Sequence, residues 1–147
     1  MNEAKRLESD LHELIPISRA MAIRVERLTE DTLVLAAPLA ANHNHAGTGF
    51  AGSLYAIASL AGWALLRTVF ERRSLSPELV LGEGTMRYLR PATGDLAATA
   101  RLPADEQSAL IERVAAGQRA RTELEIPVPD TGTAVYRGRF FARPARG

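Results

Sequence analysis

The chain has 147 residues and a mass of 15.9 kDa, which is the size of one ordinary domain. Hydrophobic residues make up 46% and charged residues 24%, a balance that supports a buried core and excludes a disordered chain. The formal net charge is only +1, so nothing indicates a nucleic-acid binder. Cysteine is absent, which excludes disulfides, zinc thiolate sites, iron–sulfur clusters and cysteine nucleophiles.

Neither a targeting signal nor a membrane span is expected. The N-terminus is charged and has no apolar signal core. The uncharged stretch over residues 38–66 contains two asparagines, two histidines and four glycines. Insertion of those polar groups into a bilayer would be costly, so the run is interpreted as a polar loop followed by a buried helix. We expect a cytoplasmic protein without membrane or nucleic-acid partners.

In chain order, the hydrophobic pattern predicts a helix, a strand hairpin, a long helix, two strands, a short helix and two last strands. The expected ranges are 3–14, 22–28, 32–37, about 51–73, 79–89, 95–102, 104–116, 118–128 and 134–141. Pro16 is expected to end the first helix, Asp105 to cap the short one and Gly117 to follow it. This order predicts a single α+β domain over residues 1–147, an antiparallel sheet of about six strands wrapped around one long central helix.

The long helix is apolar on nearly every face, which indicates burial all round. One face carries Leu54, Ile57, Ala58, Ala61, Leu65 and Val69. Tyr55 and Trp63 are expected to pack in the core or at a seam between subunits. A second subunit is expected to cover what the sheet leaves open.

The loop before this helix is polar and rich in glycine. The first N–H groups of a helix lack internal partners and lie at the positive end of its dipole. Gly47, Gly49 and Gly52 leave that backbone open to a ligand, so a developing oxyanion would be stabilised there without a metal. Asn44 adds a polar amide. The alternative is a loop in which glycine and asparagine serve only turns and capping.

Two motifs resemble the hotdog-fold thioesterase superfamily. Asn44-His-Ala-Gly-Thr-Gly-Phe-Ala-Gly52, before an apolar helix, resembles its Asn…Gly-Thr…Gly signature. Met86-Arg-Tyr-Leu-Arg-Pro-Ala-Thr-Gly-Asp95 resembles its strand, Leu-Arg-Pro, turn and Gly-Asp segment. The resemblance covers roughly residues 14–142, and it is closest to the thioesterase-like domain that follows an acetyltransferase domain of the GNAT type in some bacterial proteins.

The resemblance implies hydrolysis of an acyl thioester carried by CoA or by an acyl-carrier protein, with no cofactor beyond the CoA or phosphopantetheine of the substrate. It implies that the Gly52 N–H polarises the carbonyl and that Asn44 holds the carbonyl or the attacking water. Many relatives place a carboxylate where this chain has Ser59, and a serine without a partner base is a poor nucleophile at neutral pH. Further substrate contacts are expected from Asn42, His45, Thr48, Phe50, Ser53 and Glu83.

Three residues are candidates for the missing base. Glu83 lies between Gly82 and Gly84 in a predicted strand, and His43 and His45 lie in the loop. For each, a structural or solvated role is the stronger alternative. Metal binding by the two histidines is a weak alternative, because the loop offers no Cys, Asp or Glu, and no metal is expected.

The sequence also offers candidates for binding the rest of the substrate. Arg137 and Arg139 alternate on a predicted strand, where they either face solvent, which is favoured, or meet the CoA phosphates. Pocket depth is expected to depend on Phe50, Leu54, Ile57 and Met86.

The resemblance implies a homodimer or a dimer of dimers, with the site between subunits. A non-catalytic acyl-CoA or acyl-carrier binding module is the main alternative, and Ser59 is its main support. An enoyl-thioester hydratase is disfavoured, because such enzymes use an Asp–His pair and residues 38–66 contain no Asp. A purely structural partner protein is the weakest alternative, and it predicts no ligand-dependent change in melting temperature.

Overall fold

The computed structural model describes residues 1–145. Its elements are α1 (Glu3–Leu14), α2 (Ile17–Ala20), β1 (Arg24–Leu28), β2 (Thr32–Ala37), the short 3₁₀ helix η1 (Leu39–Ala41), α3 (Ala51–Glu71), β3 (Glu78–Tyr88), β4 (Leu96–Arg101), α4 (Ala104–Ala115), β5 (Ala120–Pro127) and β6 (Ala134–Arg143).

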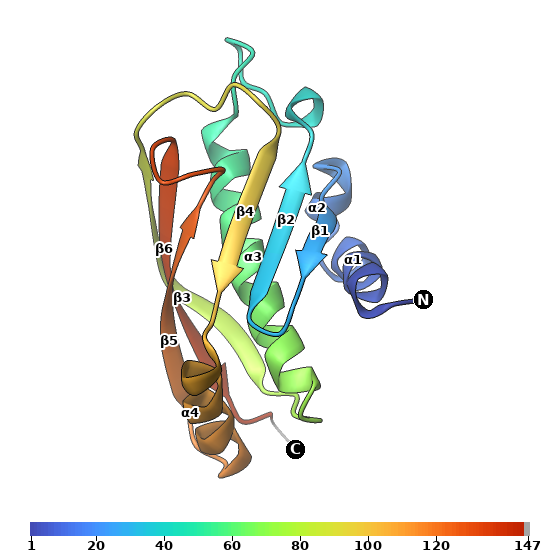
Figure 1. Ribbon diagram of the computed structural model, residues 1–147, viewed down its shortest axis with the longest axis vertical. Coiled ribbons are helices and arrows are strands. Elements are labelled where there is room, and N and C mark those ends of the chain that lie inside the picture. Colours follow the sequence, from blue (N-terminus) through green and yellow to red (C-terminus); the bar gives the residue numbers. More distant parts are fainter. Residues whose placement is uncertain (146–147) are drawn as a thin grey trace.

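The strands form two antiparallel halves that flank α3. One half has the order β1-β2-β4 and the other the order β3-β6-β5, and β4 lies beside β5 where the halves meet (Figure 1). The predicted α+β fold of about six antiparallel strands around one central helix is confirmed. The outer edge of the second half is β3, which pairs with β6 alone among the described strands.

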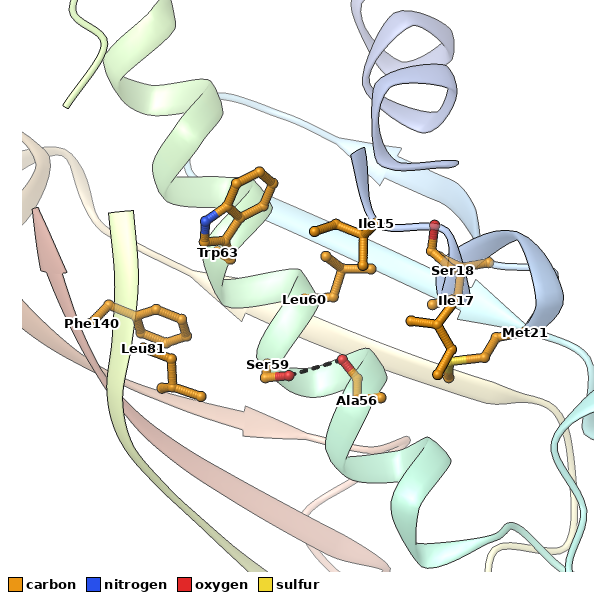
Figure 2. Close-up of a pocket in the computed structure, with 11 residues that line it drawn as sticks. Ile15, Ile17, Ser18, Met21, Ala56, Ser59, Leu60, Trp63, Leu81 and Phe140 are labelled. Carbon is orange, nitrogen blue, oxygen red and sulfur yellow. Dashed lines mark hydrogen bonds between the residues drawn. The ribbon is translucent and has the colours of Figure 1, made fainter. Parts of the chain in front are cut away.

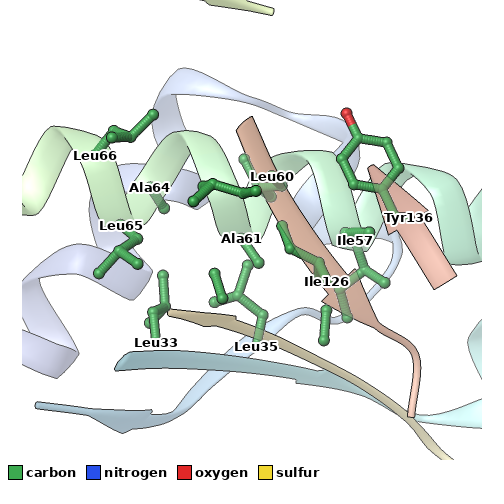
Figure 3. Close-up of a cluster of buried hydrophobic side chains, with 14 of the residues drawn as sticks. Leu33, Leu35, Ile57, Leu60, Ala61, Ala64, Leu65, Leu66, Ile126 and Tyr136 are labelled. Atoms are coloured by element: carbon green, nitrogen blue, oxygen red, sulfur yellow. The ribbon is translucent and has the colours of Figure 1, made fainter. Parts of the chain in front are cut away.

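The core lies between α3 and the sheet (Figure 3). Ile57, Ala61 and Leu65 of α3 are fully buried, as are Leu33 and Leu35 of β2. Burial of each such leucine or isoleucine stabilises the fold by about 1.5–3 kcal/mol. By length and hydropathy α3 is the one helix among residues 1–145 that could cross a membrane, but 67% of its most apolar stretch is buried in this core.

One helix-end prediction was wrong, and one short helix was missed. α1 ends at Leu14, just before Pro16, as predicted. Pro16 is also the N-cap residue of α2, the helix that the sequence did not predict. Asp105 is not the cap of α4, because the N-cap position is Pro103. Asp105 lies in the first turn, where its charge favours the helix dipole. Gly117 does follow α4, in the left-handed conformation with φ +76°.

Candidate active site

The loop before α3 is organised around the side chain of Asn44. Its Oδ1 accepts from the backbone N–H groups of Ala46 (2.9 Å) and Thr48 (3.1 Å). Its Nδ2 donates to the Thr48 hydroxyl (2.9 Å) and, at 3.4 Å, to the Gly49 carbonyl. Gly47 has φ +80°, a left-handed conformation that favours glycine. The amide expected to hold substrate or water is therefore occupied within the loop, and it holds the loop in shape.

The start of α3 presents free backbone donors. Within residues 1–145, the N–H groups of Ala51 and Gly52 have no hydrogen-bond partner, whereas those of Ser53 and Leu54 donate to the Phe50 carbonyl. Gly52 is exposed. Two unpaired donors at the positive end of a helix dipole are suited to an oxyanion or a polarised carbonyl.

One stripe of α3 is not fully covered by the rest of the chain. Gly52, Ala56, Ser59, Trp63 and Arg67 keep some exposure, while their neighbours between Leu60 and Phe70 are otherwise buried. Spacings of three and four residues place these five on one helix face. Gly52, whose N–H is free, is therefore the first residue of the helix face that carries Ser59 and Trp63.

An apolar cavity of about 260 Å³ opens along this face (Figure 2). Ala56, Ser59, Leu60 and Trp63 line it from α3. Figure 2 shows Leu81 and Phe140 on one side of this stretch of helix, and Ile15, Ile17, Ser18 and Met21 on the other. The cavity lining contains no charged residue and no histidine.

Ser59 lies in the cavity wall without a base. Its hydroxyl donates to the Ala56 carbonyl, at 3.0 Å, in its own helix. Because no carboxylate or imidazole lines the cavity, nothing within residues 1–145 removes the hydroxyl proton there. The Ser59 oxygen retains the ability to accept a hydrogen bond.

Two tyrosines pack between α3 and the β3–β6 pair. The rings of Tyr55 and Tyr136 meet edge to face with centroids 5.1 Å apart. Both hydroxyls lie close to Gly84, where a Cβ atom would stand 2.3 Å from Oη of Tyr55. Burial raises the pKa of Tyr136 and of Tyr88, and the neighbouring Tyr55 raises both further. These phenols therefore stay protonated and neutral. Tyr88 donates to the Ala51 carbonyl at 2.8 Å, which ties β3 to the helix start.

Other expected site residues lie apart from the cavity. Asn42 is buried, and its Nδ2 donates to the carbonyls of Met21 and Pro38 (both 2.9 Å). Glu83 lies on the outer face of the sheet, where it pairs with Arg139 at 3.5 Å. The structure therefore does not bring Glu83 to the cavity.

The loop histidines are exposed. Nδ1 of His43 lies 2.9 Å from the Asn44 carbonyl. Among residues 1–145, no hydrogen bond or ion pair involves the His45 ring, and no three His, Cys, Asp or Glu residues gather as a metal site.

The predicted arginine and pocket residues are also placed. Arg137 lies 3.8 Å from Glu125 and Arg139 lies 2.9 Å from Glu123, which supports the solvent-facing interpretation.

The four residues expected to set pocket depth lie elsewhere. Leu54 and Ile57 are buried in the core, Phe50 is 52% exposed and Met86 is partly buried. None of these four lines the cavity. Ser59 is the candidate site residue that does line the cavity. The rest of the lining was missed because it comes from residues 15–23, α3, β3 and β6 together.

A six-stranded antiparallel arrangement around one central helix, with a glycine-rich loop at the helix start, defines a hotdog-fold protein. Residues 4–144 match the family described as "Putative thioesterase (yiiD_Cterm)". The chain belongs to this thioesterase family.

Solved structures agree with the assignment. A Shewanella oneidensis protein described as a "putative thioesterase" is 30% identical, with a TM-score of 0.86 over 96% of this chain and 97% of that one. A Pseudomonas aeruginosa protein described as a "probable thioesterase" is 28% identical, with a TM-score of 0.85 over 98% and 97%. A mutant thioesterase from the same organism, 15% identical with a TM-score of 0.74 over 99% and 96%, shares the fold.

Proposed function

We propose that this protein hydrolyses acyl thioesters carried by CoA or by an acyl-carrier protein, at the N-terminal end of α3. The observation that carries the proposal is the unpartnered N–H of Gly52, on the same helix face as the apolar cavity. A carbonyl oxygen at that N–H would gain stabilisation as negative charge develops. The acyl chain would then extend along the face toward Ser59 and Trp63.

Asn44 acts in this proposal as a positioning residue. Its amide fixes the turn from Asn44 to Gly49, and that turn leads directly into the free N–H groups of Ala51 and Gly52. Thr48 supports the same turn through its hydroxyl. Preorganised donors stabilise a transition state better than donors that must first be ordered.

The cavity of one chain lacks a general base, and we propose that a second copy completes the site. The edge of β3 is free within the described chain, and unpaired strand edges readily add another strand. Leu81 on β3 is 37% exposed and adjoins the open stripe of α3. In a dimer built on this edge, loop 42–52 of one subunit would meet the helix or strands of the other, and His43 or His45 would serve as base near neutral pH.

The test is thiol release from acyl-CoAs and acyl-carrier proteins that carry short, long and aromatic acyl groups. Turnover by the wild type that falls with Gly52→Ala and with Asn44→Ala is the expected result. Gly94→Ala is the matched control, because a Cβ at Gly94 meets no atom within 4 Å. Turnover unaffected by Gly52→Ala would contradict the assignment of the carbonyl site.

A non-catalytic acyl-CoA or acyl-carrier binding module is the second candidate, and the Ser59 hydroxyl favours it because it has no base beside it. Acyl-CoAs would then raise the melting temperature without thiol release. An enoyl-thioester hydratase fits less well, because no Asp or His lines the cavity to move protons.

A further inference from the structure

We propose that the corner between α1 and β1, residues 15–23, is the outer wall of the acyl pocket and restricts the substrate to uncharged apolar acyl groups of medium size. This inference rests on the proposed function and specifies the substrate of that same site. The proposal assigns specificity to a segment outside the loop and outside the sheet.

The first argument is where the cavity lining comes from. Five of its eleven lining residues belong to this one corner, namely Ile15, Ile17, Ser18, Met21 and Ile23. The facing wall is Ala56, Ser59, Leu60 and Trp63 of α3. Figure 2 shows Ile17 and Met21 opposite Ser59, so an acyl chain that leaves the helix start along α3 runs between the corner and the helix.

The second argument is the chemistry of the lining. The Ser18 and Ser59 hydroxyls are its polar side-chain groups besides the Trp63 indole N–H. Ser18 donates to the Leu11 carbonyl at 3.0 Å, Ser59 to its own helix, and the indole to the Leu79 carbonyl at 3.3 Å. These bonds use all three side-chain donors, so a carboxylate at the acyl terminus would find no free donor there and would lose its hydration.

The third argument is volume. A dry apolar cavity of about 150 Å³ accommodates benzene, and this one has about 260 Å³. On the same packing, the cavity holds roughly ten carbon atoms. That size fits a medium-length alkyl chain or a substituted aromatic ring, and a longer chain must leave part of its length in solvent.

The corner is held in place before any ligand arrives. The Ile23 amide donates to the Ser18 carbonyl at 3.0 Å, and Ala22 takes a left-handed conformation with φ +57°. The side chain of Asn42 donates to the Met21 carbonyl at 2.9 Å. A preformed wall enforces a size limit more strictly than a wall that moves aside.

The test is equilibrium binding of non-hydrolysable S-alkyl-CoA thioethers of increasing chain length, followed by tryptophan fluorescence. Trp63 is the only tryptophan in the sequence and lines the cavity, so its emission reports the occupant directly. We expect affinity to rise about fourfold per added CH₂ (about 0.8 kcal/mol) and then to level off near roughly ten carbons. A chain that ends in a carboxylate should bind at least about tenfold more weakly than its methyl-ended counterpart.

Two variants narrow the pocket, and both lie outside helix α3 and outside loop 42–52. Met21→Phe acts deep in the wall, and Ile17→Phe acts at the rim, where the side chain is 60% exposed and the fold tolerates the change. Each should shorten the chain length at which affinity levels off and shift the thiol-release preference in the same direction. Leu14→Phe is the matched control, since Leu14 is 50% exposed and does not line the cavity.

The outcomes separate this inference from the proposed function. If thiol release shows a chain-length preference that neither Ile17→Phe nor Met21→Phe alters, the role of residues 15–23 is overturned. The proposed hydrolase activity then still stands. Chain-length-dependent binding that both variants shorten, without any thiol release, would overturn the hydrolase and support the pocket. Trp63 emission that no alkyl chain changes would overturn the pocket itself.

Discussion

The ring of Phe50 lies directly over Gly52, so that a Cβ atom on Gly52 would stand only 2.5 Å from Cε2 of Phe50. Phe50 is the residue before α3 and half of its surface is exposed. The ring therefore fills the space where a side chain of residue 52 would lie, while Gly52 itself stays exposed. A side chain at position 52 would displace the ring or occupy the approach to that N–H.

Gly52→Ala keeps the backbone N–H but places a Cβ where the Phe50 ring now lies. The added methyl group or the displaced ring should obstruct the carbonyl site, so turnover should fall by about 10- to 1000-fold, as when one preorganised donor is disabled. The melting temperature should change little, because the exposed ring has room to turn aside. Steady-state thiol release and thermal unfolding measure the two effects. Gly94→Ala should match the wild type in both, and an equal loss in the two variants would argue against a role for Gly52.

Asn44→Ala should also cut turnover by about 10- to 1000-fold, because the N–H groups of Ala46 and Thr48 lose their acceptor. Asn44→Asp separates loop shaping from direct contact. Its carboxylate still accepts from both N–H groups, so it should recover part of the lost rate. A rate for Asn44→Asp as low as that of Asn44→Ala would instead indicate that the amide donates to substrate.

Ser59→Ala should retain turnover within about threefold, because the hydroxyl has no base and donates to Ala56. Ser59→Asp places a carboxylate in the cavity wall and should raise the rate. Apolar surroundings would raise the pKa of that carboxyl group, so the gain should appear as pH increases. A folded Ser59→Asp protein with no gain in rate would count against the alignment with relatives that carry a carboxylate there.

Arg72 joins α1 to the far end of α3. Its guanidinium binds Glu3 at 2.7 and 2.9 Å and the Thr29 carbonyl at 3.0 Å, and these bonds hold the pKa of Glu3 below its ordinary value. Glu3 therefore stabilises the fold above its ordinary pKa of 4.5, and that contribution is lost as pH falls through the lowered value.

Arg72→Gln should reduce the free energy of unfolding by about 1 kcal/mol at neutral pH. It should also flatten the loss of stability between about pH 5 and pH 3. Urea unfolding across that range measures both. Arg101→Gln is the control, since Arg101 is exposed and lies 3.9 Å from Asp31. If Arg72→Gln leaves the pH dependence of unfolding unchanged between about pH 5 and pH 3, the Glu3–Arg72 pair does not cause that loss of stability.

Sedimentation should show a species of at least two chains at micromolar concentration, because the β3 edge and the open stripe of α3 are both left uncovered by one chain. A charged substitution beside them, Leu81→Lys, should shift the protein toward the monomer. A wild-type species that stays near 16 kDa would contradict the dimer.

Helix α3 was predictable because its signal is local. An apolar run begins after a polar loop, and burial of Ile57, Ala61 and Leu65 follows from helical periodicity. The start at Ala51 agrees with the sequence, and the end at Glu71 differs by two residues. α2 was missed because proline ends one helix and equally well begins the next.

The site was only partly predictable, because its cavity depends on distant residues. Ile17, Trp63 and Leu81 meet in space, and no spacing along the chain indicates that meeting. The place of Glu83, for which a solvated role was the stronger alternative, depends on a more specific feature. A register shift between Leu81 and Glu83 lets Leu81 line the cavity while Glu83 pairs with Arg139 outside. Local irregularities of this kind decide which face a strand residue occupies.

The proposed outer wall of the acyl pocket, residues 15–23, is one continuous segment of the chain. Most pockets draw their selectivity from side chains scattered over many elements, so that altering selectivity disturbs the core. Here residues 15–23 contribute five lining side chains, while the proposed carbonyl site belongs to α3. Exchange of this single segment between members of the family would therefore transfer the acyl-chain preference and leave the residues at the start of α3 unchanged.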